Sequence, residues 1–493
     1  MDALEGSPRV IKEGKNLTEK KPFVVLIGAD TFPPDVNGAA RFGERLAAGL
    51  ARRGIEVHVV APATSEVHGN FRENHDGTPI VVHRLKSHRF PGHKTLRYVN
   101  PLNLRSKTDR ILRQVKPDVV HVQSHLNIGR QLSKGAKKRG ITLIATNHIM
   151  PENLIKYTVG TPEWIEKPFA DFAWWDAKNV LKLADAVTTP TKRAAHLLES
   201  KTGLTGVYSI SCGIDASAYA DAPPATNKPA TLLFVGRLDH EKRIHVLLKA
   251  VSLLDPKFDV KVELVGDGSE RQPLEAYAEE LGIRDKINFL GPVSDAELMQ
   301  ALHRSSIFVM PSIAELQSIA TMEAMASGRP VVAADAMALP HLVHSGDNGY
   351  LFKADDSKDF AAQLTKVLEA DAEEFERLVN NSLHLIQAHD INKTLDIFEK
   401  LYRGEKPDGT TADNDDEYNT PLGNRALTRA MRDARERLND ARDGVIERLD
   451  EMGEKVVERF EDIRYDVRSN TKKINRKIQR GMKRAIERMR REG

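Results

Sequence analysis

The strongest constraint on the fold is a series of short, continuous apolar runs that alternates with helical stretches and occurs twice along the chain. Such runs are typical of parallel strands that are covered on both faces of a sheet. The first series predicts a helix at 38–53 and strands at 23–28, 55–62, 117–123, 141–148 and 184–191. The second predicts strands at 231–237, 260–266, 287–293, 306–312 and 330–335. We therefore predict an α/β fold of two facing Rossmann-like domains with an interdomain cleft, since open α/β sheets bind ligands beyond the carboxyl ends of their strands.

The same patterns set the expected domain boundaries. A flexible leader at 1–20 precedes a first domain at 21–212 and a second domain at 213–385, and a terminal helix at 386–403 crosses back to the first domain. Residues 404–423 contain almost no apolar side chains and are predicted to be a disordered linker, because such a segment cannot bury enough surface to fold.

Composition excludes several classes of protein. The single cysteine, Cys212, excludes an intrachain disulfide framework and a cysteine-based zinc cluster, and it is compatible with a reducing compartment. The first 20 residues lack the apolar core of a signal peptide, and no apolar run reaches the roughly 18 residues of a membrane span. We expect a cytoplasmic protein.

The last segment, 424–493, is predicted to be a basic amphipathic helix that forms a C-terminal tail. It contains 21 Lys and Arg against 14 Asp and Glu, and its apolar residues recur every eleven positions, as at Leu427, Leu438 and Leu449. Eleven residues make three helical turns, so the apolar stripe stays on one face. A basic helix of this kind favours an anionic membrane interface, although a right-handed coiled coil or a partner-binding helix has the same period. The stripe argues against a nucleic-acid partner.

Two short segments carry the predicted chemistry. Arg237 and Lys242 lie in GRLDHEK, which leaves a strand and enters a helix, so both cations stand beside the backbone N–H groups of a helix start. This is a phosphate site in outline, and a solvated loop is the alternative interpretation. Glu315 and Glu323 flank a second helix start, where carboxylates can meet sugar hydroxyls; one surface and one capping glutamate would give the same spacing.

Together these segments resemble the family-four glycosyltransferases with the GT-B fold. The donor-domain motifs are GRLDHEK, FLGPV and the stretch from 311 to 335, which has two glutamates eight residues apart followed by EAMASGRPVVA. The first domain agrees at 30–62, 116–125, 146–148 and 211–215. The resemblance covers about residues 23–404 and implies a retaining transferase with a nucleotide-sugar donor.

The resemblance also implies roles for individual residues. Arg237 and Lys242 would neutralise the donor diphosphate, Glu323 would hydrogen-bond the ribose and Glu315 would face the transferred sugar. The other donor-site residues that it implies are Gly38, Pro292, Val293, Leu316, Gln317 and Ser318. His148 would lie beside the reacting sugar, and the acceptor side would comprise Asn37, His125, Asn147, His148, Trp174 and Trp175. Leu316, Gln317 and Ser318 replace the Gly-Phe-Gly that is common in the family, so backbone contacts to the donor are expected to differ here.

No classical catalytic base is evident. In retaining members the departing phosphate is thought to accept the acceptor's proton, so positioning and charge stabilisation carry the catalysis; displacement by a carboxylate nucleophile is the second route. We expect no cofactor and no metal, because Arg237 and Lys242 would offset the leaving-group charge and the only Asp-x-Asp, at 413–415, lies in the linker.

The acceptor is predicted to be a membrane lipid. Residues 146–154 and 314–326 resemble the diacylglycerol glycosyltransferase branch more closely than sucrose or glycogen enzymes. All three tryptophans fall at 164–175, where they would line an acyl groove or simply pack beneath the cleft. Residues 84–113 contain nine Lys and Arg and one acid, which favours anionic headgroups or a solvated basic face.

The prediction is therefore a hexosyltransferase on the inner face of the cell membrane, peripheral to it, acting on diacylglycerol or a glycosyl-diacylglycerol. The donor is of the UDP-glucose or GDP-mannose type, between which the sequence does not distinguish. Alternatives are a transferase for phosphatidylinositol or a soluble acceptor, a catalytically inactive membrane-binding protein, and a sugar-nucleotide epimerase on the same fold.

Overall fold

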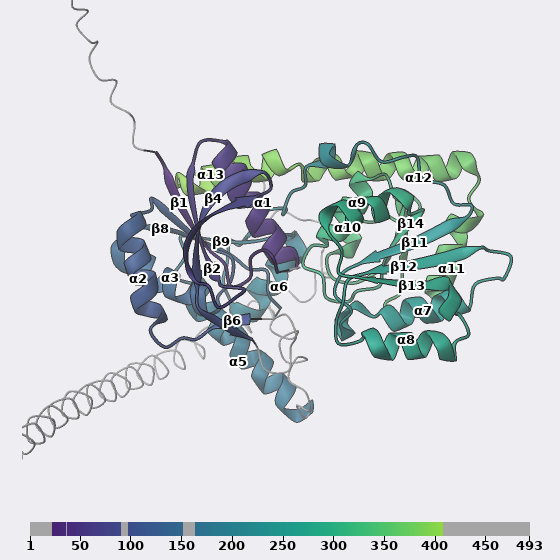
Figure 1. Ribbon diagram of the computed structural model, residues 1–493, viewed down its shortest axis with the longest axis horizontal. Helices are drawn as coiled ribbons and strands as arrows, with labels where there is room; N and C mark the ends of the chain where they lie inside the picture. The colour runs from purple at the N-terminus through teal and green to yellow at the C-terminus, as the bar shows by residue number, and fades with distance from the viewer. Residues whose placement is uncertain (1–21, 36, 90–96, 151–162, 408–493) are drawn as a thin grey trace, which may run out of the picture. The chain divides into compact units, whose positions relative to one another are not determined.

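The computed structural model describes residues 22–35, 37–89, 97–150 and 163–407 (Figure 1). The chain divides into units at 1–414 and 415–493, and all described residues belong to the first unit. The predicted leader, nearly all of the predicted linker and the predicted C-terminal helix lie outside the described residues. None of the described helices has the length and apolar character needed to cross a membrane.

The first sheet has eight strands in the order β10-β9-β8-β7-β1-β2-β4-β3. Every neighbouring pair is parallel except β3 and β4. The run β4-β2-β1-β7-β8-β9 has the doubly wound Rossmann order. The strands are β1 (Val24–Gly28), β2 (Glu56–Pro62), β3 (Gly69–His75), β4 (Thr78–Leu85), β7 (Val119–Val122), β8 (Thr142–Thr146), β9 (Ala186–Thr189) and β10 (Tyr208–Ser209); β5 (Ser87–Arg89) and β6 (Arg97–Val99) form a separate antiparallel pair.

Helices connect the strands of this first domain. They are α1 (Gly38–Arg52), α2 (Leu104–Val115), α3 (Asn127–Arg139), α5 (Glu163–Leu181) and α6 (Lys192–Thr202). Polar side chains start two of them: the Asn37 side chain accepts a hydrogen bond from the Ala40 N–H, and Thr191 accepts one from Ala194. Apolar clusters lie on both faces of the sheet, as buried parallel strands require.

The second sheet has six parallel strands in the order β13-β12-β11-β14-β15-β16, again the Rossmann order. The strands are β11 (Ala230–Val235), β12 (Val260–Val265), β13 (Ile287–Gly291), β14 (Ile307–Met310), β15 (Val331–Ala334) and β16 (Gly349–Phe352). The α-helices are α7 (Ile244–Ser252), α8 (Arg271–Glu280), α9 (Asp295–Arg304), α10 (Ile319–Ala326), α11 (Ser357–Glu369) and α12 (Ala372–Leu385). Short 3-10 turns are η1 (Ala216–Tyr219), η2 (His240–Lys242), η3 (Arg284–Lys286) and η4 (Leu339–His341).

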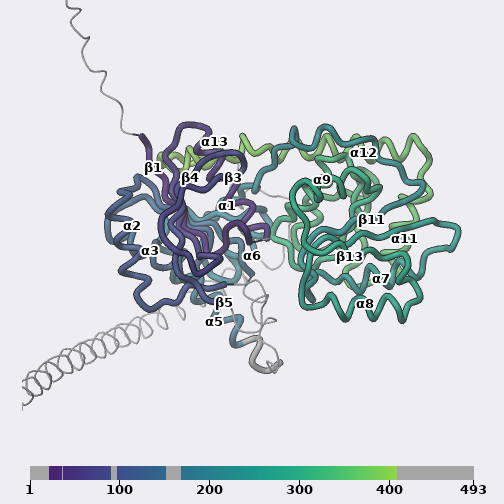
Figure 2. The backbone as a smooth tube through the Cα atoms, viewed as in Figure 1, coloured from purple at the N-terminus to yellow at the C-terminus, as the bar shows by residue number. Residues whose placement is uncertain are grey.

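The described chain ends by returning to the first domain. After α12, the turn η5 (Ile386–His389) leads into α13 (Ile391–Tyr402), which lies beside α1 (Figures 1 and 2). Phe398 is fully buried in the first-domain core, with its ring centroid 5.9 Å from that of Phe42. The Tyr402 hydroxyl lies 2.7 Å from Nδ1 of His121 on β7. Residues from the end of the described chain therefore complete a core that begins with β1.

The predicted α/β fold with two Rossmann-like sheets is confirmed, and each predicted apolar run contains a strand. The hairpin of β3 and β4 was not predicted, because β3 is an edge strand that alternates half-buried and exposed positions and has no apolar run. Its position also corrects the interpretation of the basic stretch. Arg84 is buried on β4 and pairs with Glu73 of β3 at 2.6 Å, so it is not part of a basic surface.

The packing of α13 gives a test of this arrangement. Phe398→Ala removes a fully buried ring from the first-domain core and should lower the free energy of unfolding by about 3–5 kcal/mol. Phe169→Ala, at a side chain that is 42% exposed on α5, should change it by less than about 0.5 kcal/mol. Urea unfolding followed by tryptophan fluorescence measures both. Equal destabilisation by the two variants would contradict the packing of α13 on the first domain.

Candidate active site

Three of the predicted donor residues, Arg237, Lys242 and Glu315, lie at one point of the second sheet. Strands β11 and β14 are neighbours, although β12 and β13 separate them in the chain. Arg237 follows the carboxyl end of β11, and Glu315 lies in the loop between β14 and α10. Connections that leave adjacent strands in opposite directions open a crevice at their carboxyl ends, which is where doubly wound sheets bind ligands. The strand order therefore brings these two predicted segments together.

Ion pairs hold both predicted phosphate-binding cations. Arg237 contacts the carboxylates of Asp239 and Glu241 at 2.7 and 3.0 Å, and both acids are nearly fully buried. The Lys242 ammonium lies 2.5 Å from Oε1 of Glu315, with both side chains largely buried. The two cations are thus oriented by carboxylates while the Arg237 side chain stays one-third exposed. Such an arrangement can present positive charge to an anion without ordering long side chains at the moment of binding.

Glu323 is buried on α10 and pairs with the first domain. Its Oε1 accepts a hydrogen bond from Nη2 of Arg45 on α1 at 2.6 Å, and the same nitrogen lies 3.3 Å from the hydroxyl of Tyr219. Burial and then the Glu323 carboxylate raise the pKa of that phenol well above its usual value. A carboxylate and a phenol at the start of the crevice form a set of groups that can hydrogen-bond hydroxyls of a ligand.

The loop before α10 is tied to the segment that links the domains. Gln317 accepts a hydrogen bond from the Cys212 backbone N–H at 2.7 Å and donates one to the Ser211 hydroxyl at 3.0 Å. The backbone oxygen of Leu316 accepts a hydrogen bond from Thr191 at 3.0 Å. Ser318 caps α10 by accepting a hydrogen bond from Thr321 N–H. Thus the Gln317 side chain and the Leu316 backbone hold this loop against the first domain, while Ser318 starts α10.

The start of α1 approaches the same loop. Asn37 caps the helix, and a Cβ built on Gly38 would lie 3.8 Å from Cδ1 of Ile319 on α10. Further along the same face of α1, Arg41 forms an ion pair with Asp295 of α9. The predicted glycine loop and the predicted donor loop therefore meet.

Three histidines lie near the carboxyl ends of β7 and β8 in the first sheet. Burial lowers the pKa of His121 to about 3, and burial lowers the pKa values of His125 and His148 to about 4. Nε2 of His148 lies 3.1 Å from the side-chain oxygen of Gln123, and its ring packs on Phe42 with centroids 4.9 Å apart. All three imidazoles are therefore neutral at physiological pH.

The remaining predicted residues are more scattered. Pro292 is exposed and Val293 half-buried just after β13, at the same edge of the second sheet as Arg237. Asn147 is buried and folds back on the Ile149 backbone. Trp174 is only 2% exposed and belongs to the first-domain core, whereas Trp175 is half-buried with its ring 5.5 Å from that of Phe172.

Sequence reasoning missed Arg41, Arg45 and Tyr219. A signal was present for the two arginines, because Gly38, Arg41 and Arg45 stand three and seven positions apart and so share one helical face. Nothing in the sequence pairs them with acids more than 250 positions away. Among the residues that the structure describes, no group of three or more His, Cys, Asp or Glu side chains could hold a metal ion.

Comparisons with known proteins agree with this geometry. A model described as Glycosyltransferase Family 4 matches residues 36–218, and one described as Glycosyl transferases group 1 matches residues 217–384. Over 325 residues the chain is 30% identical to a GDP-mannose-dependent alpha-mannosyltransferase of Mycobacterium tuberculosis, covering 63% of this chain and 79% of that protein.

Other relatives carry different names. An alpha-monoglucosyldiacylglycerol synthase of Streptococcus pneumoniae is 24% identical over 384 residues, which cover 75% of this chain and 83% of that protein. A phosphatidyl-myo-inositol mannosyltransferase of Mycolicibacterium smegmatis is 36% identical over 165 residues, or 32% and 42% of the two chains. The solved structure of Anabaena HepE in complex with UDP-glucose matches with a TM-score of 0.61 at 18% identity, covering 77% of this chain and 99% of that chain, and so shows the same fold.

The buried histidines predict how stability depends on pH. The folded protein favours neutral imidazole, whereas histidine in the unfolded chain titrates near pH 6.5. The stabilisation is therefore complete above pH 6.5 and is lost as the pH falls toward 4. Urea unfolding at several pH values measures the fall in the free energy of unfolding between pH 7 and pH 4. In His148→Gln this fall should be smaller by about 1–3 kcal/mol than in the unchanged protein. His68→Gln, at an exposed histidine, should follow the unchanged protein; an identical acid profile for His148→Gln would contradict the interpretation.

Proposed function

The chain belongs to glycosyltransferase family 4 and has the GT-B fold, and we propose that it transfers a hexose from a nucleotide-sugar donor to a membrane lipid with retention of anomeric configuration. The observation that carries the proposal is the meeting of Arg237, Lys242 and Glu315 at the β11–β14 crevice, with Glu323 on α10, the helix that follows the Glu315 loop and faces α1. Two cations and two carboxylates in this arrangement suit a ligand that combines a diphosphate with two sugars.

The diphosphate is assigned to Arg237 and Lys242. Asp239 and Glu241 aim the Arg237 guanidinium, and Glu315 holds Lys242 in the absence of ligand. A donor phosphate would take over the Lys242 ammonium, which leaves the Glu315 carboxylate to accept hydrogen bonds from the hexose. The two cations stabilise the charge that develops on the leaving phosphate as the glycosidic bond breaks. Glu323, beside Tyr219 and Arg45, is assigned to the ribose hydroxyls.

Retention follows if the acceptor hydroxyl attacks on the face from which the nucleoside diphosphate leaves. The departing phosphate oxygen then takes the acceptor's proton, and no protein base is required. His148 supports this route, because burial lowers its pKa to about 4 and so makes its imidazole a weak base, which Gln123 orients as a polar wall. Displacement by a carboxylate is the rival route, for which Glu315 would be the candidate nucleophile once a donor phosphate has taken over Lys242.

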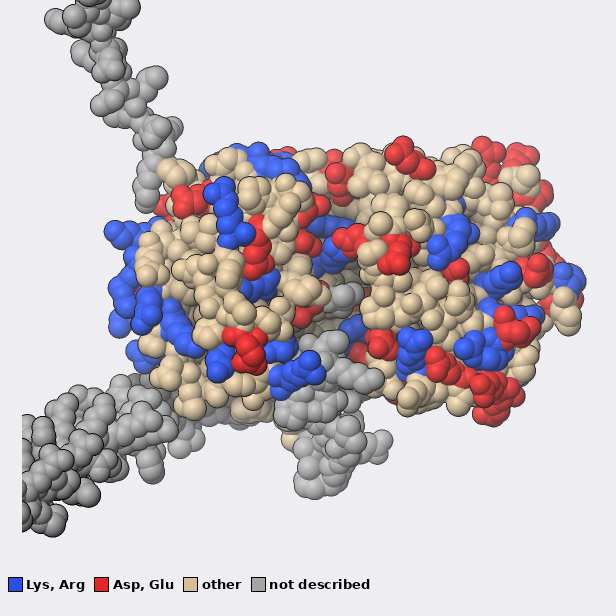
Figure 3. Space-filling model, viewed as in Figure 1, with Lys and Arg blue, Asp and Glu red and all other residues tan. Residues whose placement is uncertain are grey.

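The lipid acceptor is supported by surface chemistry and by one relative's name. Figure 3 shows Lys and Arg side chains gathered over α2 and α3, where Arg105, Arg110 and Arg113 are exposed. On α5, Phe169 and Phe172 are 42% and 58% exposed. Exposed aromatic rings together with cations favour contact with an anionic membrane surface. Diacylglycerol is the acceptor class in the name of the Streptococcus pneumoniae relative, and we extend it to this chain.

Phosphatidylinositol is the second candidate acceptor. The observation in its favour is the 36% identity with the phosphatidyl-myo-inositol mannosyltransferase, which is higher than that with the diacylglycerol enzyme but covers a much shorter part of the chain. The two candidates predict different labelled products, so one screen separates them.

The first functional prediction concerns the donor site. With radiolabelled UDP-glucose or GDP-mannose and vesicles that contain diacylglycerol or phosphatidylinositol, the full chain should label one lipid. Arg237→Gln should lower kcat/KM by about 100-fold, because it removes charge stabilisation of the leaving group. Arg304→Gln, at a partly exposed arginine paired with Glu263, should stay within about twofold. Addition of EDTA should leave the rate unchanged.

Three results would overturn parts of this proposal. Absence of labelled lipid with both donors would remove the lipid-transferase function and favour an inactive membrane-binding protein. Equal losses in the two arginine variants would remove the phosphate role of Arg237. Inhibition by EDTA that Mg²⁺ reverses would remove metal independence.

The second functional prediction concerns the C-terminal segment. A chain that ends at Gly404 keeps every described helix and strand, because α13 ends at Tyr402. Flotation with vesicles that contain anionic lipid should fall at least tenfold in this variant, since about 1 kcal/mol is expected for each basic residue near the surface. Vesicles of neutral lipid should bind neither chain well. Unchanged flotation of the truncated chain would assign membrane binding to the first domain alone.

A further inference from the structure

A cavity of about 410 Å³ lies apart from the candidate active site. It is lined by the start of α6, by the segment that links the domains, by the region after β15 and by the turn that leads into α13. None of its lining residues is among the predicted donor or acceptor residues. Its volume is within the range of small-molecule sites.

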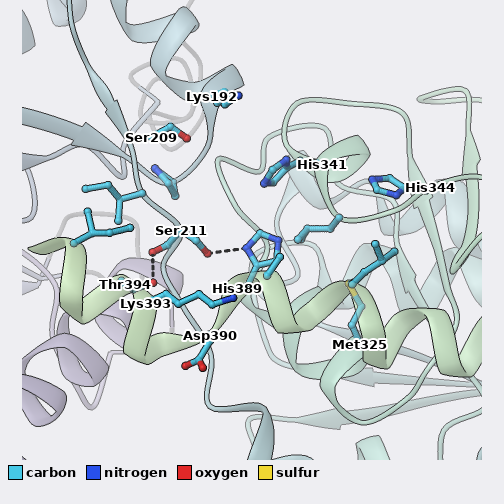
Figure 4. A pocket seen from close by; sticks show the side chains of 16 residues that line it. Lys192, Ser209, Ser211, Met325, His341, His344, His389, Asp390, Lys393 and Thr394 are labelled. Atoms are coloured by element: carbon cyan, nitrogen blue, oxygen red, sulfur yellow. Dashed lines mark hydrogen bonds between the residues drawn. The ribbon is translucent and has the colours of Figure 1, made fainter. Parts of the chain in front are cut away.

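The polar lining is predominantly basic. Lys192 and Ser209 lie on the first-domain side, His341 and His344 lie on the second-domain side, and Lys393 lies on α13 (Figure 4). Asp390 is the single acid in the lining, and its carboxylate already accepts a hydrogen bond from the Asn392 backbone N–H at 2.7 Å.

The charge around the cavity acts on His389. Its ring lies between the two sides of the cavity, 5.3 Å from the ring of His341. Burial, together with the nearby positive charges of His341 and Lys393, lowers the pKa of His389 to about 4. Lys192 and Lys393 outnumber the single carboxylate of Asp390 in the lining, so the cavity has positive potential even with a neutral His389, which favours a bound anion.

We propose that this cavity binds a small phosphate monoester, such as a sugar phosphate, as an effector that is distinct from donor and acceptor. A phosphate dianion has several acceptor oxygens and can meet Lys192 and Lys393 from different sides while imidazole N–H groups donate to the rest. The volume exceeds that of inorganic phosphate, so the site has room for a carbon skeleton that packs on Ile210, Leu342 and Ile397.

Two hydrogen bonds connect this cavity to the donor loop. Nδ1 of His389 lies 2.9 Å from the Ser211 hydroxyl, and that hydroxyl accepts a hydrogen bond from Gln317 at 3.0 Å. Gln317 is also bonded to the Cys212 backbone. A ligand that fixes His389 and Ser211 therefore also fixes the loop at 315–318, which contains Glu315.

The site is made by parts of the chain that change their spacing if the domains rotate. A phosphate that contacts the first domain, the second domain and α13 at once stabilises their present arrangement by its binding free energy. The bound effector thus favours one interdomain state, and it acts on the donor crevice without occupying it.

The test is calorimetric titration of the full chain with glucose 6-phosphate and with inorganic phosphate, using glucose as the neutral control. Glucose 6-phosphate should bind and glucose should not. The double variant Lys192→Gln/Lys393→Gln should raise the Kd at least tenfold, because two charge-assisted contacts are lost. Lys261→Gln, at an exposed lysine on β12, should leave the Kd within twofold, and so should Arg237→Gln, which weakens the candidate donor site. Lys192 and Lys393 are at least partly exposed, so their replacement does not threaten folding.

Hydrogen exchange supplies the second readout. Glucose 6-phosphate should slow exchange of the backbone amides at 315–318 in the unchanged chain and not in the double lysine variant. Absence of binding by both phosphates, or binding that Arg237→Gln abolishes while the double variant keeps it, would overturn the site. Binding without slower exchange would overturn its connection to the donor loop. Neither measurement requires transferase activity, so failure here is distinguishable from failure of the proposed function.

Discussion

The structure depends on the one point in each sheet at which the strand order reverses. Crossovers between parallel strands are right-handed, so the helices after β11 and β14 leave toward opposite faces and open a crevice between those strands. Arg237 enters this crevice from one strand and the loop of Glu315 enters from the other. The pair β1 and β7 repeats the arrangement in the first sheet, and its crevice carries the start of α1 and His125. Side chains that are far apart in sequence become neighbours through strand order alone.

Contacts across the two crevices are polar and specific. Arg45 pairs with Glu323 and Arg41 with Asp295, so one face of α1 is bound to two helices of the second domain. Gln317 adds hydrogen bonds to Ser211 and Cys212 of the linking segment. Such pairs exchange partners more readily than a packed apolar interface, because each lost contact can be replaced by a ligand or by water. An enzyme that must admit and release a donor benefits from that property.

Continuous apolar runs were sufficient to predict β1, β2 and β7 to β9 in the first sheet and β11 to β15 in the second. Strands that are buried on both faces are apolar throughout, so the sequence alone reveals them. The edge strand β3 escaped because its sequence is polar and its stability comes from pairing. Its partner β4 was also missed, although it contains the short apolar run 80–82. Arg84 shows the general reason: its neutralising acid, Glu73, lies on the neighbouring strand, and only the register reveals it. In the site, the resemblance supplied the predicted donor residues, but Arg45 of α1, the ion-pair partner of Glu323, could not be inferred, because the sequence of a helical face does not reveal what that face contacts.

The return of α13 has a consequence for how the chain is made. The first-domain core contains Leu395, Phe398 and Tyr402, yet the ribosome adds these residues only after the whole second domain. In the nascent first domain, the apolar surface beside α1 that α13 later covers therefore stays exposed while about 180 further residues are synthesised. A stretch that is exposed for so long is a natural place for a chaperone to bind. The two domains are separate in architecture but cannot be completed one after the other.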